Sequence, residues 1–199
     1  MTQLKLYSHP ISGNGYKVRL LLALLGLEYE LVNVDLLAGE NLTPAFKQLN
    51  PRGQVPVLAD GDTVIWDSMA ILVYLARRYG NGVWLPTDAV AEAQVMQWLA
   101  VSENELLYGL ARARATLLLK RPFNLEQCQT EGRAGLAVME QQLTGHEWLV
   151  AGRPTIADIA CYPYVLLAPA GEISLEAYPH VRQWLARVEA LPGWVPMTA

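Results

Sequence analysis

The segment from Ser8 to Arg19 places polar side chains where a thiol could be held as a thiolate. Ser12 and Asn14 stand in a loop rich in glycine and proline that leads into a helical pattern. The free N–H groups and the dipole of a helix N-terminus favour an anion. A free thiol has a pKa of about 8.5, and a hydrogen-bond donor that stabilises the thiolate lowers that pKa. Both residues are therefore candidates for thiolate stabilisation, and a plain helix cap is the alternative.

A second candidate segment has a proline inside a strand-like run, Gln54-Val55-Pro56-Val57-Leu58. Proline has no N–H, so it cannot join a central strand ladder in the normal way. A cis Val55–Pro56 bond would turn the Val55 backbone outward and expose its N–H and C=O to a peptide ligand. The alternative is a trans proline on an edge strand, because only about 5–6% of X–Pro bonds in folded proteins are cis.

A third segment places an acid and a hydroxyl at the start of a helix, in Trp66-Asp67-Ser68-Met69. This pair suits an amino acid group: Asp67 can pair with an ammonium, while Ser68 and its backbone N–H can hold a carboxylate. A simple N-cap is again the alternative interpretation.

The elements that must position these residues fall into two regions. Residues 1–78 alternate strand and helix signals in the order β-α-β-α-β-β-α, with a crossover that implies a parallel first pair of strands. Residues 79–86 are the predicted linker. Residues 87–199 show helical periodicity throughout, with Val95, Leu99, Ser102 and Leu106 on one face of a long helix and capping-box patterns at Asn124 and at Thr155. The sequence thus predicts an α/β thioredoxin-like domain followed by an all-α domain.

Taken together, these features resemble the cytosolic glutathione S-transferases. The first loop, the Gln-Val-Pro strand, the acid-Ser helix start and the later Thr155-Ile-Ala-Asp158 box occur in that family's order and spacing, over essentially the whole chain. The resemblance implies a glutathione-binding first domain, a helical domain that shapes the second-substrate site, and a homodimer. It implies an enzyme that activates the glutathione thiol for attack on an electrophile. A glutathione-dependent isomerase, peroxidase or disulfide reductase, and a non-catalytic binding module, are the alternatives.

The resemblance also implies roles for single residues. Ser12 matches the thiol-activating serine of theta- and zeta-like members, and Asn14 is the second candidate, since some bacterial members use asparagine nearby. Val55 matches the residue that pairs with the cysteinyl backbone of glutathione, and Pro56 matches the cis-proline. Asp67 and Ser68 match the pair that holds the γ-glutamyl end, and Gln54 is expected to reach the glycyl carboxylate.

Two departures narrow the class. The first loop has no cysteine, so members that work through mixed disulfides are poor models. Tyr7 stands one residue before the position of the tyrosine in tyrosine-type members, so we expect it in the core. Trp98, Tyr108 and Tyr164 are candidates for lining the electrophile pocket, with core packing as the alternative.

Composition excludes several other classes. The net charge is −4, and the chain has no basic stripe, so nucleic acid is not an expected partner. No apolar run reaches the roughly 20 residues of a membrane span. The start of the chain lacks a secretory pattern, and a cytoplasmic location is expected by default. Cys128 and Cys161 have no metal-site spacing, the three histidines suggest no metal, and the cysteines are expected to be buried and reduced.

Overall fold

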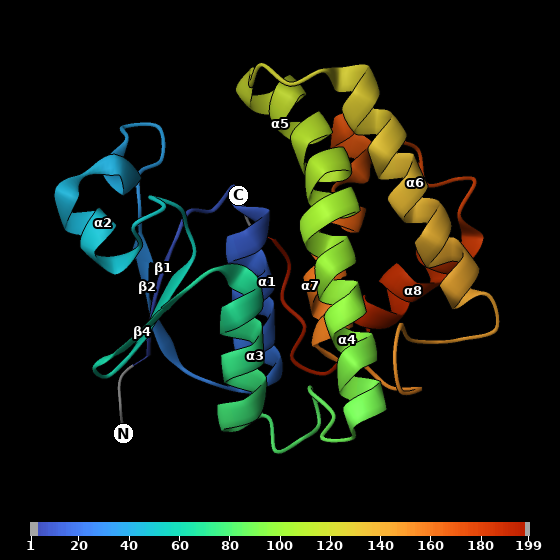
Figure 1. Ribbon diagram of the computed structural model, residues 1–199, viewed down its shortest axis with the longest axis horizontal. Helices are drawn as coiled ribbons and strands as arrows, with labels where there is room; N and C mark the ends of the chain where they lie inside the picture. The colour runs from blue at the N-terminus through green and yellow to red at the C-terminus, as the bar shows by residue number, and fades with distance from the viewer. Residues whose placement is uncertain (1–3, 198–199) are drawn as a thin grey trace. The chain divides into compact units, whose positions relative to one another are not determined.

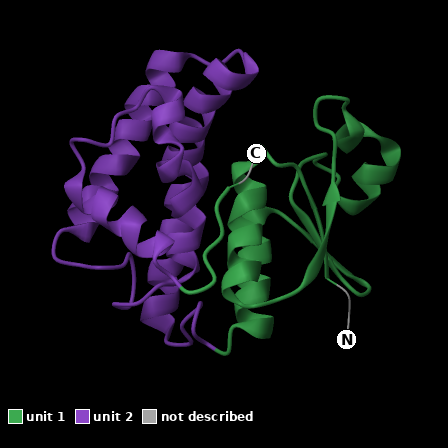
Figure 2. Cartoon of the chain, turned by 180° about the vertical axis from the view of Figure 1, so that it is seen from behind, with its two compact units in different colours: residues 1–81, 192–199 green, residues 82–191 purple. Residues whose placement is uncertain are grey.

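The computed structural model describes residues 4–197 (Figure 1). The chain forms two compact units (Figure 2). The first runs to Asn81 and also takes in the segment from Pro192 onward, and the second is Gly82–Leu191.

A four-stranded sheet is the centre of the first unit. Its order is β2-β1-β3-β4, with β1 parallel to β2 and the other neighbours antiparallel. The strands are β1 (Leu4–Ser8), β2 (Tyr29–Asn33), β3 (Val57–Asp60) and β4 (Thr63–Trp66). This is the predicted element order, with its parallel first half and antiparallel second half.

Helices cover both faces of this sheet (Figure 1). They are α1 (Gly13–Leu24), the short 3₁₀ turn η1 (Glu40–Leu42), α2 (Pro44–Leu49) and α3 (Ser68–Tyr79). Alternate residues of β1 point to opposite faces, so Leu4 and Leu6 are buried on one side. On the other side Tyr7 packs against a cluster that includes Phe46 of α2. The prediction that Tyr7 is a packing residue is therefore confirmed.

All regular secondary structure of the second unit, residues 82–191, is helical. Its elements are α4 (Ala89–Val101), the π-helical segment η2 (Ser102–Ala111), α5 (Arg112–Leu119), α6 (Leu125–Leu143), α7 (Ile156–Leu166), the 3₁₀ turn η3 (Ala168–Gly171) and α8 (Pro179–Glu189). The predicted stripe of Val95, Leu99, Ser102 and Leu106 is buried. These two units give the predicted fold class, a thioredoxin-like α/β domain with an all-helical domain.

The capping box before α7 is part of a buried polar cluster of the second unit. The Asp158 carboxylate is fully buried and accepts hydrogen bonds from Leu149 N at 3.1 Å, Thr155 N at 2.8 Å and Trp184 Nε1 at 2.9 Å. The Thr155 hydroxyl is a further partner at 3.2 Å. Burial raises the pKa of Asp158, although the bonds from Trp184 and Thr155 oppose that shift. The cluster joins the start of α7 to α8 and to the loop before α7.

Two sequence-based expectations need correction. Asn124 caps α6 by accepting from Gln127 N at 3.0 Å, but the Gln127 side chain donates to Glu131, so the reciprocal half of the predicted capping box is absent. The predicted helical domain also took in residues 192–199. The described part of that segment belongs to the first unit, because the Tyr16 hydroxyl donates to Val195 O at 2.7 Å.

Candidate functional site

Three loops meet at one end of the sheet in the first unit. Tyr7 pairs with Val57 and Val57 pairs with Trp66, so these residues form one row across β1, β3 and β4. Neighbouring strands lie about 4.8 Å apart. The loop after β1, the Val55–Pro56 bond before β3 and the Asp67–Ser68 pair after β4 all adjoin this row. The strand register therefore brings the three predicted segments to the same sheet end.

The Val55–Pro56 peptide bond is cis. Within residues 4–197, no hydrogen bond uses the Val55 N–H or C=O. The Asn50 side chain fixes the loop before this bond. Its Nδ2 donates to Gln54 O at 2.7 Å, and its Oδ1 accepts from Arg52 N at 2.9 Å. The Gln54 side chain is exposed. The Val55 backbone is therefore a free edge that an extended peptide can pair with.

Ser12 is the N-cap of α1. Its Oγ accepts from Gly15 N at 3.0 Å, and its own N–H donates to His9 O at 2.9 Å. The capping interpretation of Ser12 is thus correct, and it is compatible with the functional one. Capping uses an oxygen lone pair, and the hydroxyl proton has no acceptor among the described residues, so it can be donated to an anion. Asn14 is the second residue of α1 and is half-buried.

Asp67 and Ser68 open α3. The Asp67 carboxylate accepts from Met69 N at 3.0 Å and from Arg52 Nη1 at 3.2 Å. Asp67 has φ 77°, in the left-handed region that L residues rarely adopt. The Ser68 Oγ is buried and has no hydrogen-bond partner in the part of the chain that the structure describes. Buried hydroxyls are normally paired, so this one is a candidate contact for a bound ligand.

Arg52 is a site residue that sequence reasoning missed. It lies fifteen positions before Asp67 and is brought to it by the turn between α2 and β3. The two residues form an ion pair at this sheet end. The available signal was its place inside Asn50-Pro51-Arg52-Gly53, directly before the proline-containing strand.

The three aromatic residues considered for the electrophile pocket differ in the structure. Trp98 and Tyr164 are buried, at 8% and 6% exposed, while Tyr108 is 41% exposed. Trp98 also forms a wall of a cavity of about 210 Å³ inside the second unit.

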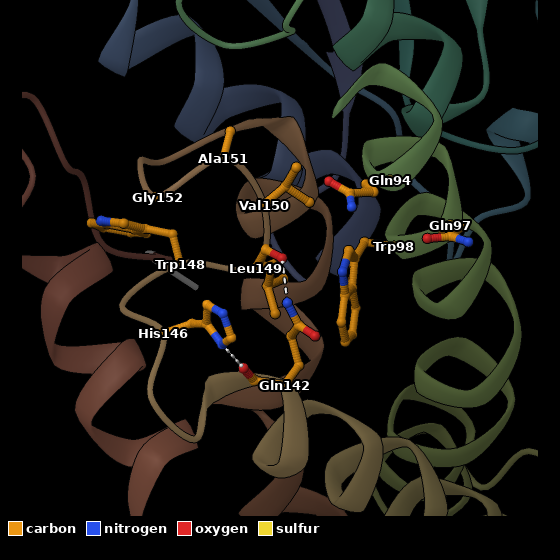
Figure 3. A pocket seen from close by; sticks show the side chains of 10 residues that line it. All are labelled: Gln94, Gln97, Trp98, Gln142, His146, Trp148, Leu149, Val150, Ala151 and Gly152. Atoms are coloured by element: carbon orange, nitrogen blue, oxygen red, sulfur yellow. Dashed lines mark hydrogen bonds between the residues drawn. The ribbon is translucent and has the colours of Figure 1, made fainter. Parts of the chain in front are cut away.

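That cavity lies between α4, the end of α6 and the loop before α7 (Figure 3). Its lining includes the side chains of Gln94, Gln97 and Gln142. Gln142 Nε2 donates to Leu149 O at 3.0 Å. None of the seven predicted site residues lines this cavity.

Other site types receive no support from residues 4–197. No group of three or more His, Cys, Asp or Glu side chains there could hold a metal ion. In that range, no helix combines the length and the hydropathy needed to cross a bilayer. Cys128 and Cys161 are both buried thiols.

The fold and the arrangement of this sheet end define a class: two-domain proteins with a thioredoxin-like unit and a helical unit. Two family models match the chain. The one described as "Glutathione S-transferase, N-terminal domain" matches residues 2–77, and "Glutathione S-transferase, C-terminal domain" matches residues 116–192. The chain belongs to the glutathione S-transferase family.

Characterised relatives carry several activities in their names. Glutathione S-transferase Z1 of Arabidopsis thaliana is 44% identical over 96% of this chain and 90% of its own length. Maleylacetoacetate isomerase of Pseudomonas aeruginosa is 31% identical over 96% and 93%. Disulfide-bond oxidoreductase YfcG of Escherichia coli is 30% identical over 90% and 87%.

Solved structures share the whole fold. A glutathione S-transferase from Pseudomonas fluorescens Pf-5 has a TM-score of 0.94 and 37% identity, and each chain is covered completely. A second family member from Pseudomonas fluorescens Pf-5, solved with two glutathione molecules bound, has a TM-score of 0.85 and 29% identity over 96% of this chain and 90% of its own.

Proposed function

We propose that this protein is a glutathione transferase that binds reduced glutathione at the β1–β3–β4 sheet end and directs its thiolate at an electrophilic carbon. The observation that carries the proposal is the open Val55 backbone beside the cis-proline, at the sheet end that also holds Ser12 and Ser68. Glutathione is a peptide with a thiol, so it needs an exposed strand edge for its backbone and a donor for its sulfur.

Each predicted residue then has one task. The Val55 N–H and C=O pair with the cysteinyl backbone, and Gln54 reaches the glycyl carboxylate. At the other end of the ligand, Asp67 pairs with the γ-glutamyl ammonium and the Ser68 hydroxyl donates to the γ-glutamyl carboxylate. This assignment is supported by the unpartnered Ser68 Oγ, which a carboxylate oxygen would satisfy.

For the thiol we favour Ser12 over Asn14, as in the serine-type, theta- and zeta-like members. The Ser12 hydroxyl donates to the thiolate while its oxygen still caps α1. The thiolate sulfur forms a bond to the electrophilic carbon, and the leaving group departs with its bonding electrons. No covalent bond to the enzyme is needed.

A second candidate function is a glutathione-dependent isomerase or disulfide reductase. It is favoured by the relatives whose names carry these activities. Because Cys128 and Cys161 are buried in the helical unit, disulfide reduction here would use the thiolate of glutathione itself rather than an enzyme thiol.

The direct experiment has two stages. The protein should be retained on immobilised glutathione and eluted by free glutathione. It should then be assayed with a panel of aryl halides, peroxides and disulfides. Retention without turnover of any panel member would support a non-catalytic binding module and contradict the transferase proposal.

We further propose a homodimer and a cytoplasmic location. Two-fold dimers are the commonest oligomers, and the buried thiols of Cys128 and Cys161 suit a reducing compartment. Light scattering at micromolar concentration should give twice the chain mass, and a monomer would contradict the dimer.

A further inference from the structure

Arg112 is held between helical segments by two aromatic rings. Its guanidinium carbon lies 4.0 Å from the centroid of the Tyr108 ring and 4.8 Å from that of Phe123. Tyr108 stands one turn earlier on η2, and Phe123 lies in the turn before α6. Both distances are within the range of a cation–π contact. We call these three residues the Arg112 cluster.

The chain turns back on itself to bring Phe123 to this position. Lys120 ends α5 with φ 53°, in the left-handed region. Arg121 N then donates to Ala115 O at 3.3 Å, and Phe123 N donates to Arg121 O at 2.9 Å. The turn is thus held by its own backbone, and the Arg112 cluster is built before any ligand arrives.

The cation–π contacts use the charge of Arg112 and leave its N–H donors available. A guanidinium has five N–H donors, which lie in its plane. No acceptor or carboxylate among residues 4–197 hydrogen-bonds or ion-pairs with Arg112. Glu131 is in the same neighbourhood, because both side chains influence the Cys128 thiol, but its carboxylate accepts from Gln127 Nε2 at 2.9 Å.

Basic residues are concentrated in the stretch of chain around Arg112. Residues 106–125 contain four basic residues and no acidic one, although Glu105 and Glu126 flank the stretch directly. Lys120 and Arg121 in that stretch are exposed. A half-buried guanidinium that two rings hold in place binds a planar carboxylate through two parallel N–H···O bonds.

We propose that the Arg112 cluster binds the carboxylate of an aromatic acid. The carboxylate takes the N–H donors of Arg112 that have no partner among the described residues. The aromatic body of the ligand packs on the Tyr108 and Phe123 rings, which are 41% and 37% exposed. The proposal stands on the geometry of the second unit alone and is independent of the proposed transferase function.

Binding is tested by calorimetry, without glutathione. The probes are 3,5-dinitrobenzoate and its neutral carboxamide, neither of which has a leaving group. We expect the wild type to bind the acid about tenfold more tightly than the amide, and Arg112→Gln to remove that preference. Arg182→Gln, which removes an exposed arginine of α8, is the matched control and should keep it.

Several outcomes would overturn the inference. One is that the wild type binds the acid and the amide equally. Another is that Arg112→Gln and Arg182→Gln lose the preference for the acid to the same extent. Retained amide binding reports that Arg112→Gln is folded. If that variant does not fold, Arg112→Lys keeps the charge but not the planar fork, and a full wild-type preference in it would contradict the two-point contact.

Discussion

Arg52 Nη1 lies 3.2 Å from Asp67 Oδ2 at the start of α3. The two side chains are 52% and 27% exposed, so water screens the pair and its contribution to stability is small. The contact instead fixes one carboxylate oxygen, while Met69 N fixes the other at 3.0 Å. Asp67 is therefore held in one orientation beside the Ser68 hydroxyl.

The charge of Asp67 is predicted to act in glutathione binding. Asp67→Asn keeps a good N-cap residue and one that tolerates positive φ, but it removes the partner of the γ-glutamyl ammonium. We expect KM for glutathione to rise about tenfold with kcat nearly unchanged, since a uniform binding interaction is lost. Asp62→Asn, an exposed aspartate in the turn between β3 and β4, is the control. An unchanged KM in Asp67→Asn would exclude the ammonium contact.

Ser68→Ala is predicted to separate binding from stability. The Ser68 Oγ is buried without a partner, so its removal should leave the free energy of unfolding within about 1 kcal/mol of wild type or raise it. Glutathione binding should weaken and kcat at saturation should change little. Steady-state kinetics and urea denaturation measure the two effects. A large fall in kcat at constant KM would place Ser68 near the thiol and contradict the assignment.

Gly15 is predicted to be required for the first loop to pack. A Cβ at Gly15 would lie 2.0 Å from Ser8 Oγ, and Ser8 Oγ is itself buried without a partner. Gly15→Ala should therefore cost about 1–3 kcal/mol by overpacking. Ser8→Ala should be nearly neutral, and the double variant should recover most of the loss, because the next contact is at 3.3 Å. A double variant as unstable as Gly15→Ala would show that the strain lies elsewhere.

Asp158→Asn is predicted to destabilise the helical unit by about 2–4 kcal/mol. An asparagine side chain accepts through its one oxygen only. Its NH₂ group would face the donor that now binds the other carboxylate oxygen, which is either Trp184 Nε1 or Thr155 N. Asp88→Asn at the exposed N-cap of α4 is the matched control, because asparagine caps as well as aspartate. Equal free energies of unfolding for the two variants would contradict the importance of the buried cluster.

The sequence predicted the sheet unit well because local signals and family resemblance agreed there. Proline in a strand, a hydroxyl at a helix start and a period-two strand are all visible without distant contacts, and the cis Val55–Pro56 bond expected from the resemblance is confirmed. The pairing of Arg52 with Asp67 was not visible, because it depends on the register of β3 against β4.

The helical unit was predicted more coarsely. Its long stripe from Val95 to Leu106 was predicted. The change from α-helix to π-helix at Ser102 was not, because the spacing of these residues also fits a single uninterrupted helix. Gln127 occupies a capping-box position in the sequence. In the structure, however, its side chain donates to Glu131, one turn later on α6. The Arg112 cluster was missed, because Phe123 reaches Arg112 only through the turn at Lys120.

The most direct test of the account is the pKa of the bound glutathione thiol. The ultraviolet absorbance of the thiolate is followed against pH in wild type, Ser12→Ala and Asn14→Ala, each saturated with glutathione. We expect a bound pKa below the free value in wild type, a higher pKa in Ser12→Ala, and little change in Asn14→Ala, each unit being about 1.36 kcal/mol of differential stabilisation. A pKa that rises in Asn14→Ala and stays low in Ser12→Ala would contradict the assignment and leave Ser12 as a helix cap.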